Sequence, residues 1–166
     1  MNTEQKITVV KRVTFDSAHF LYNDKFGQDL NCQIFGKCSP FKTGGPEFEP
    51  HGHTYVLEVH VTGLINRNTG FVIDFKVLKM IINDEIVDVL DHRLLNNVIP
   101  ESYAPYTVEN MLVYLAYDTK LRERIAEVTD DQACVSKLRM WETEGSYSEI
   151  NIGEQNDCNS GCCSCG

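Results

Sequence analysis

Residues 51–62 read HGHTYVLEVHVT, and apolar side chains occupy alternate positions along most of this stretch. Tyr55, Leu57, Val59 and Val61 fall on one side, and the positions between them are mainly polar. A period of two is the pattern of a β-strand that buries one face and exposes the other. The stretch therefore predicts a strand of a sheet that is covered on one side.

A second strand is predicted at residues 7–20, ITVVKRVTFDSAHF, a stretch rich in β-branched and aromatic residues. Val13, Phe15, Ser17 and His19 share one face at the strand period. The connection over residues 21–50 is rich in Asn, Asp, Gly and Pro and ends in KTGGPEFEP. Long connections of this kind are usually functional, so we expect an active-site loop here.

Two helices are predicted after these strands. Asp74 suits the N-cap of a helix that runs to about Leu90, and Thr107 suits the N-cap of the next helix, with Glu109 in its first turn. The apolar positions at helical spacing are Phe75, Leu78, Ile81, Ile82, Val89 and Leu90, then Val108, Met111, Leu112, Leu115 and Ile125.

The remaining elements complete an α+β pattern. Residues 134–142, CVSKLRMWE, and 147–152 read as a third and a fourth strand, which gives the order ββααββ. Residues 1–152 fit one domain. Residues 153–166 show no apolar periodicity, and we expect a disordered tail there.

The overall charge limits the partners. The chain has 166 residues and a formal net charge of -9, and it shows no cluster of Lys and Arg that could follow a nucleic-acid backbone. Nucleic acid is therefore not expected as a partner. A small phosphorylated substrate would need local cations, and Lys37, Arg93 and Arg12 are the candidates.

The N-terminus and the cysteines bear on the compartment. The first residues contain no apolar run long enough for a signal peptide or a membrane span. Four of the seven cysteines crowd the last nine residues: Cys158, Cys162, Cys163 and Cys165. This crowding is unlike a disulfide framework, and the spacing lacks the paired C-x2-C units of a structural zinc site. We expect a reduced, cytoplasmic protein that does not bind membranes.

Three histidines form a candidate metal site. His51 and His53 stand two residues apart on a strand, so both imidazoles point to one face. Catalytic zinc usually has three protein ligands and one open position. His19, at the end of the first strand, is the natural third ligand. His60 has the opposite strand parity and is read as a surface or cross-strand histidine.

Seven motifs, in order along residues 15–143, resemble the 6-pyruvoyltetrahydropterin synthase family, which includes the 6-carboxytetrahydropterin synthases of queuosine biosynthesis. They are F-x-S-A-H from Phe15, F-G-K-C from Phe35, H-G-H-x-Y from His51, G-x-V-x-D-F from Gly70, L-D-H-x-x-L-N from Leu90, P-x-T-x-E-N from Pro105 and W-E-T from Trp141.

The resemblance implies a T-fold, with a four-stranded antiparallel sheet, two helices on one face, and assembly into a homohexamer whose sites lie between subunits. It implies zinc held by His19, His51 and His53. It also implies proton transfer by Cys38 with Asp91 and His92. Glu142 would anchor the pterin ring rather than the ion, and Thr107 and Glu109 would help to hold the ring.

The proton-transfer residue remains open between a cysteine and a glutamate. Cys38 precedes His51 by twelve intervening residues, more than the family usually has, and some relatives use a glutamate close before H-G-H. Glu47 and Glu49 occupy that neighbourhood. The F-G-K-C context favours Cys38, with Lys37 and the metal favouring its thiolate.

Three functions are weighed. The first is a lyase that converts 7,8-dihydroneopterin triphosphate to 6-carboxy-5,6,7,8-tetrahydropterin for a 7-deazaguanine pathway. The second is a 6-pyruvoyltetrahydropterin synthase for tetrahydrobiopterin, which shares the substrate and the zinc. The third, from another class, is a metal-binding protein without enzymatic activity, suggested by the histidine pair and the cysteine tail.

Overall fold

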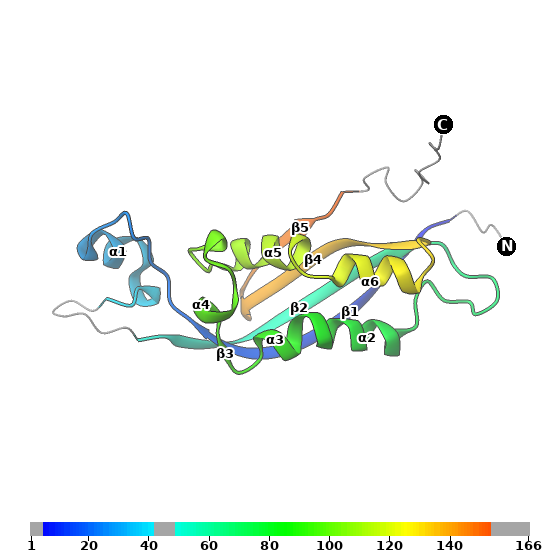
Figure 1. Ribbon diagram of the computed structural model, residues 1–166, viewed down its shortest axis with the longest axis horizontal. Coiled ribbons are helices and arrows are strands. Elements are labelled where there is room, and N and C mark those ends of the chain that lie inside the picture. Colours follow the sequence, from blue (N-terminus) through cyan, green and yellow to red (C-terminus); the bar gives the residue numbers. More distant parts are fainter. Residues whose placement is uncertain (1–4, 42–48, 154–166) are drawn as a thin grey trace, which may run out of the picture.

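The computed structural model describes residues 5–41 and 49–153. Figure 1 shows a long sheet whose one face is covered by helices. The fold class is the expected α+β class. The strands are β1 (Ile7–His19), β2 (His51–Gly63), β3 (Arg93–Leu94), β4 (Ala133–Thr143) and β5 (Ser146–Asn151).

The sheet of the described residues has five strands in the order β3-β1-β2-β4-β5. The expectation of four antiparallel strands is corrected by β3, which pairs parallel with β1 at Ser17 and Ala18. A two-residue strand is too short to show any periodicity, so the sequence pattern could not reveal it. The other pairs of neighbouring strands are antiparallel.

More helical segments are present than the two that the sequence predicts. They are α1 (Gln28–Phe35), η1 (Gly36–Cys38), α2 (Phe75–Ile82), η2 (Asn83–Val87), α3 (Asp88–Leu90), α4 (Leu95–Val98), η3 (Glu101–Tyr103), α5 (Val108–Tyr117) and α6 (Leu121–Val128). The segment from α2 to α3 matches the first predicted helix, with Asp74 accepting the N–H of Lys76 as its cap. The second predicted helix divides into α5 and α6.

The loop predicted at residues 21–50 contains a short helix of its own. Asn31 of α1 is 1% exposed, and its side-chain amide donates to the carbonyls of Asn23, Phe26 and Gly27. Polar contacts hold this helix in place, so its sequence shows little of the apolar periodicity that would predict a helix. Figure 1 places α1 beyond the end of the helical layer, at the end of the molecule where β2 begins.

The core lies between the sheet and the helices. The alternating residues of β2 point into it, with Tyr55, Leu57, Val59 and Val61 all 0% exposed. Leu78, Ile82 and Ile86 meet them from the α2 segment, and Met111 and Leu115 meet them from α5. Complete burial of such side chains stabilises the fold by about 1.5–3 kcal/mol each. The predicted strand face is therefore the core face.

Gly63 ends β2 at a point where the chain is tightly packed. A Cβ atom on this residue would lie 2.5 Å from the Cβ of Ala133 and 2.5 Å from the carbonyl oxygen of Gln132. No side chain fits at such distances.

In the described residues, no helix is long and apolar enough to cross a membrane.

Candidate active site

The pairing of β1 with β2 brings the three histidines together. In the antiparallel register His19 is opposite His51, and Ser17 is opposite His53. Residues directly opposite each other share a face of the sheet. The ring centroids of His19 and His51 lie 4.6 Å apart, those of His19 and His53 5.2 Å, and those of His51 and His53 4.7 Å. The three imidazoles form one cluster on the side of the sheet that the helices cover.

The surroundings of His19 fix which of its ring nitrogens faces the cluster. His19 is 0% exposed, and its Nδ1 lies 2.9 Å from the carbonyl oxygen of Tyr106. A carbonyl can only accept, so Nδ1 carries the proton and Nε2 keeps its lone pair. That Nε2 lies 3.1 Å from Nε2 of His51. Such a carbonyl partner on the remote nitrogen is usual for a histidine that binds a metal ion.

Burial favours the neutral form of His19 and His51. It lowers the pKa of His19 to about 4, an effect that the Tyr106 carbonyl opposes and the neighbouring histidines reinforce. The pKa of His51 is lowered as well, first by burial and then by His53. Within the described residues, Nε2 of His53 is buried and makes no hydrogen bond. Imidazole nitrogens that gather on one face and are not all occupied by hydrogen-bond partners suit a cation, so the donor set fits a metal ion.

Cys38 and Glu142 adjoin the histidines. The ligand atoms of His19, Cys38 and His51 lie within 4.8 Å of one another, as do those of His19, His53 and Glu142. Burial raises the pKa of the Cys38 thiol, and the charge of Glu142 raises it further. We expected Lys37 to favour the thiolate, but burial and Glu142 act in the opposite direction.

A cavity of about 280 Å³ opens beside this cluster. Its lining includes four residues singled out in the sequence: Cys38, Thr107, Glu109 and Glu142. Thr107 caps α5, its hydroxyl accepting the N–H of Asn110, so the N-terminus of α5 borders the cavity. The thiol, two carboxylates and a helix N-terminus therefore border one open cavity.

Sequence reasoning missed several residues of this site. Ser148 of β5 lines the cavity, and its hydroxyl donates to Oε1 of Glu109 at 3.2 Å. The Tyr106 carbonyl orients His19, and the Tyr55 hydroxyl lies 3.4 Å from Nδ1 of the same ring. Ser148 stands on the predicted fourth strand, so strand alternation could have placed it on one face, but only the fold places that face against α5.

Asp91 and His92 form a pair that lies apart from the three histidines. Nδ1 of His92 is 2.8 Å from Oδ2 of Asp91, and Oδ1 of Asp91 accepts the backbone N–H of Asp16 at 2.8 Å. That backbone bond is the largest cause that lowers the pKa of Asp91, followed by the bond from His92. His92 has φ of 55°, a left-handed conformation that is sparsely populated for residues other than Gly and often found at functional sites.

The position of Asp16 shows on which face of the sheet this pair lies. Asp16, Asp91 and His92 each offer one ligand atom, and these three atoms lie within 4.8 Å of one another. Asp16 is opposite Thr54 in the sheet, one position away from the Ser17–His53 pair, so its side chain points to the opposite face. One chain therefore holds the two halves of the predicted catalytic group on opposite faces of the sheet.

The comparisons with known proteins show the family of the chain. The model of the family described as 6-pyruvoyl tetrahydropterin synthase matches residues 8–152. The chain belongs to this family. Membership gives it a broad class, that of a lyase that acts on a pterin.

Relatives within the family carry different names. The 6-pyruvoyl tetrahydrobiopterin synthase of Dictyostelium discoideum is 34% identical over 110 residues, which are 66% of this chain and 75% of the relative. The 6-carboxy-5,6,7,8-tetrahydropterin synthase of Haemophilus influenzae is 29% identical over 154 residues, 85% of this chain and 96% of the relative.

Solved structures share the fold. The 6-pyruvoyl tetrahydropterin synthase of Caenorhabditis elegans has a TM-score of 0.73 at 25% identity and covers 92% of this chain and 100% of its own. The synthase of Plasmodium vivax has a TM-score of 0.60 at 18% identity, covering 90% of this chain and 100% of its own, and shows the fold alone. The T-fold expected from the motifs is therefore confirmed.

Other residues named from the sequence are spread more widely. Glu49 is exposed immediately before β2, whereas Glu47 and the four terminal cysteines lie outside the described residues. Lys37 is exposed beside Cys38, and Arg93 lines a second cavity of about 540 Å³ with His92. The guanidinium of Arg12 lies 5.4 Å from the ring centroid of Trp141.

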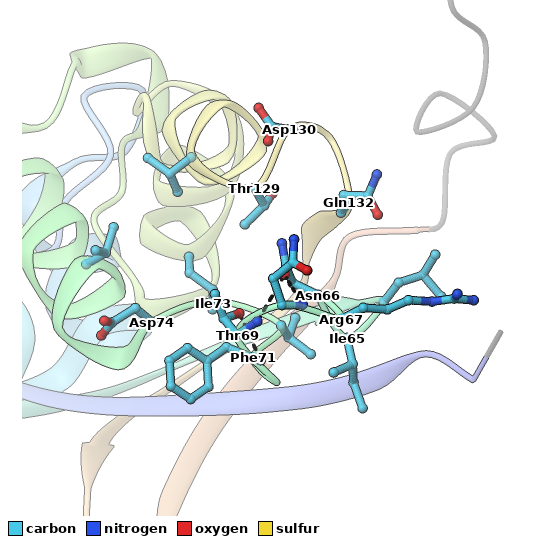
Figure 2. A pocket seen from close by; sticks show the side chains of 15 residues that line it. Ile65, Asn66, Arg67, Thr69, Phe71, Ile73, Asp74, Thr129, Asp130 and Gln132 are labelled. Carbon is cyan, nitrogen blue, oxygen red and sulfur yellow. Dashed lines mark hydrogen bonds between the residues drawn. The ribbon is translucent and has the colours of Figure 1, made fainter. Parts of the chain in front are cut away.

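A larger hollow, of about 750 Å³, lies at the other end of β2 from the histidines. Figure 2 shows it between the connection from β2 to α2 and the turn that follows α6. Asn66 organises that connection, its side-chain oxygen accepting the N–H groups of Asn68 and Thr69. The site residues expected from the family do not line this hollow, and its size alone indicates neither a ligand nor a reaction.

Proposed function

We propose that the chain is a zinc-dependent lyase that converts 7,8-dihydroneopterin triphosphate and one water molecule to 6-carboxy-5,6,7,8-tetrahydropterin, with loss of triphosphate and acetaldehyde. One observation carries the proposal. A cluster of three imidazoles adjoins a cavity that is lined by Cys38, Glu109 and Glu142. This arrangement would combine a cation site, a proton-transfer group and acceptors for a planar ring.

His19, His51 and His53 would hold the metal ion through their neutral ring nitrogens. The ion would supply Lewis acidity at the side-chain hydroxyls of the substrate, which makes the neighbouring carbon-bound hydrogens easier to remove. The Tyr106 carbonyl supports this role, because it holds His19 in the tautomer that leaves Nε2 available.

Cys38 would move a proton at the substrate side chain, since it faces both the cavity and the histidines. His92 would be its partner. Asp91 accepts the Nδ1–H of His92, which leaves Nε2 free to take or give a proton. Asp91 and His92 lie on the face of the sheet opposite the three imidazoles, so we propose that they serve the cavity of a neighbouring subunit. A homohexamer with sites between subunits would provide this arrangement.

Glu142 and Glu109 would recognise the pterin. A carboxylate can accept two hydrogen bonds from the 2-amino group and the adjacent ring N–H, a planar donor pair. Thr107 and the N-terminus of α5 border the same cavity and add polar groups. Lys37, next to Cys38 in the chain, and Arg93, beside His92, are the cations that we propose for the triphosphate.

The comparisons support two products. The Haemophilus influenzae carboxy-producing relative matches over nearly its whole length, at 96%, which supports the carboxy product. The Dictyostelium discoideum pyruvoyl-producing relative is more identical, at 34%, but over a shorter part of the chain. The alternative is therefore a 6-pyruvoyltetrahydropterin synthase, which would use the same residues and retain the three-carbon side chain.

Product identification tests the proposal. The purified protein is incubated with 7,8-dihydroneopterin triphosphate, the pterin is measured by mass spectrometry, and released acetaldehyde is trapped. We expect 6-carboxytetrahydropterin with one acetaldehyde per turnover. A pyruvoyl product without acetaldehyde would assign the alternative, and unchanged substrate would contradict both functions.

A metal-binding protein without activity is tested separately. If deletion of residues 153–166 abolished zinc binding while His53→Ala left it intact, the proposed site would be wrong. We expect the reverse, because the histidine cluster lies in the folded domain.

A further inference from the structure

The open cavity beside the histidines is bordered by two carboxylates, those of Glu109 and Glu142. Among the described residues that line it, none is Lys or Arg. An ionised carboxylate only accepts hydrogen bonds, so this lining favours a ligand group that donates N–H bonds and disfavours a phosphate. The group that fits the cavity is therefore a nitrogen-bearing ring or an amine, and a phosphate of the same ligand would lie outside it.

Ser148 meets one of these carboxylates from the sheet. Its hydroxyl donates to Oε1 of Glu109 at 3.2 Å. Ser148 is opposite Met140, which is 0% exposed, so Ser148 lies on the face of β5 that the helices cover. The helix α5, which begins one residue before Glu109, packs against β5. The hydrogen bond therefore joins the edge strand of the sheet to the first turn of α5 at the border of the cavity.

The carboxylate of Glu109 needs such a partner to hold one orientation. Glu109 is exposed, and an exposed glutamate side chain samples several staggered rotamers. Its place in the first turn of α5 favours the negative charge but does not select a rotamer. The hydroxyl of Ser148 engages Oε1, so Oε2 is the oxygen that a ligand in the cavity would meet.

We propose that Ser148 is a positioning residue that orients the Glu109 carboxylate toward the ring of a bound pterin and so sets the affinity for that ring. The inference rests on the proposed function for the identity of the ring. Ser148 acts through Glu109 and has no direct part in proton transfer. Removal of its hydroxyl therefore weakens the binding of the ring more than it slows the reaction of the bound substrate.

Calorimetric titration of the full-length protein with 7,8-dihydroneopterin tests the proposal, because this pterin carries the ring but lacks the triphosphate leaving group. Ser148→Ala should raise the Kd about three- to tenfold, the scale of one hydrogen bond. Ser148→Thr keeps the hydroxyl and should bind the pterin as the parent protein does. Ser146→Ala is the matched control, because Ser146 lines the same cavity but lies at the start of β5, opposite Thr143. Its Kd should equal that of the parent protein.

A double-mutant cycle separates positioning from a merely structural role. In the Glu109→Ala background, Ser148→Ala should change the Kd less than about twofold, because the two residues act as one unit. An equal loss of affinity with and without Glu109 would overturn the proposal. So would a Kd of Ser148→Ala equal to that of the parent protein, or a Ser148→Thr variant that binds as weakly as Ser148→Ala.

Failure of the proposed function has a different signature. A parent protein that binds 7,8-dihydroneopterin but forms neither product from the triphosphate would contradict the proposed function, and the comparison of Kd values would still decide the role of Ser148. A parent protein that does not bind 7,8-dihydroneopterin would overturn the positioning role itself.

Discussion

At the scale of single residues, His19 shows how far sequence reasoning reaches. The H-x-H spacing places His51 and His53 on one strand face, and strand parity separates His60 from them. The partner of His19 could not be predicted from spacing, because the register of two strands is set by the whole pair. The structure supplies that register, and with it the Tyr106 carbonyl that orients the ring.

Alanine substitutions test the three proposed ligands. His19→Ala, His51→Ala and His53→Ala should each lose most of the roughly one zinc ion expected per chain, together with most of the activity. His60→Ala is the matched control, because His60 has the opposite parity on the same strand as His51 and His53. Metal analysis after gel filtration measures the content. Full zinc retention in all three variants would rule out the site.

The proton-transfer residue is tested by a second set of substitutions. Cys38→Ala should reduce turnover by roughly a hundredfold or more with zinc retained, the usual scale for the loss of a general base. Glu49→Gln should change turnover little, because Glu49 is exposed and does not line the cavity of Cys38. Steady-state kinetics measure both variants. Near-normal turnover in Cys38→Ala, with collapse in Glu47→Gln or Glu49→Gln, would transfer the role to the glutamate.

At the scale of elements, strong apolar periodicity and helix-capping residues predicted the elements that they mark. The long strands, the segment from α2 to α3 and the Thr107 cap all follow from local pattern. The missed elements carry no such pattern, since β3 is two residues long and α1 is held around a buried asparagine. The break between α5 and α6 depends on tertiary contacts. Lys120 donates its N–H to Glu85, and Arg124 pairs with Glu85, both across to the η2 segment.

Close packing at the end of β2 makes Gly63 a test of the sheet. Gly63→Ala should lower the free energy of unfolding by about 1–3 kcal/mol, because the new methyl group meets backbone and Cβ atoms that cannot easily move. Gly145→Ala, in the turn between β4 and β5, is the matched control, since no atom lies within 4 Å of its added Cβ. Urea denaturation measures both. Equal stability of the two variants would mean that the sheet adjusts freely at this end.

At the scale of the whole molecule, the separation of Asp91 and His92 from the three histidines is the reason for proposing a second subunit. Neither the motifs nor their order could show which face each group occupies, because parity relates only residues on the same strand or on paired strands. The family resemblance implied sites between subunits, and that assembly remains a proposal.

Mixed oligomers test it. Cys38→Ala and His92→Asn should each be inactive alone, and Asn is chosen because it tolerates the left-handed backbone of residue 92. Equal coexpression should restore about a quarter of the parent activity if each site draws the two residues from different chains at random. Activity that stays at the level of the separate variants would place both residues in the site of one chain.

The most direct test of the account is a crystal structure of the protein with bound 7,8-dihydroneopterin, with anomalous data collected at the zinc edge. We expect one anomalous peak within bonding distance, about 2.0–2.1 Å, of ring nitrogens of His19, His51 and His53. The pterin should lie beside Glu142 in the adjoining cavity. A structure without metal at these histidines, or with the pterin bound elsewhere, would contradict the account.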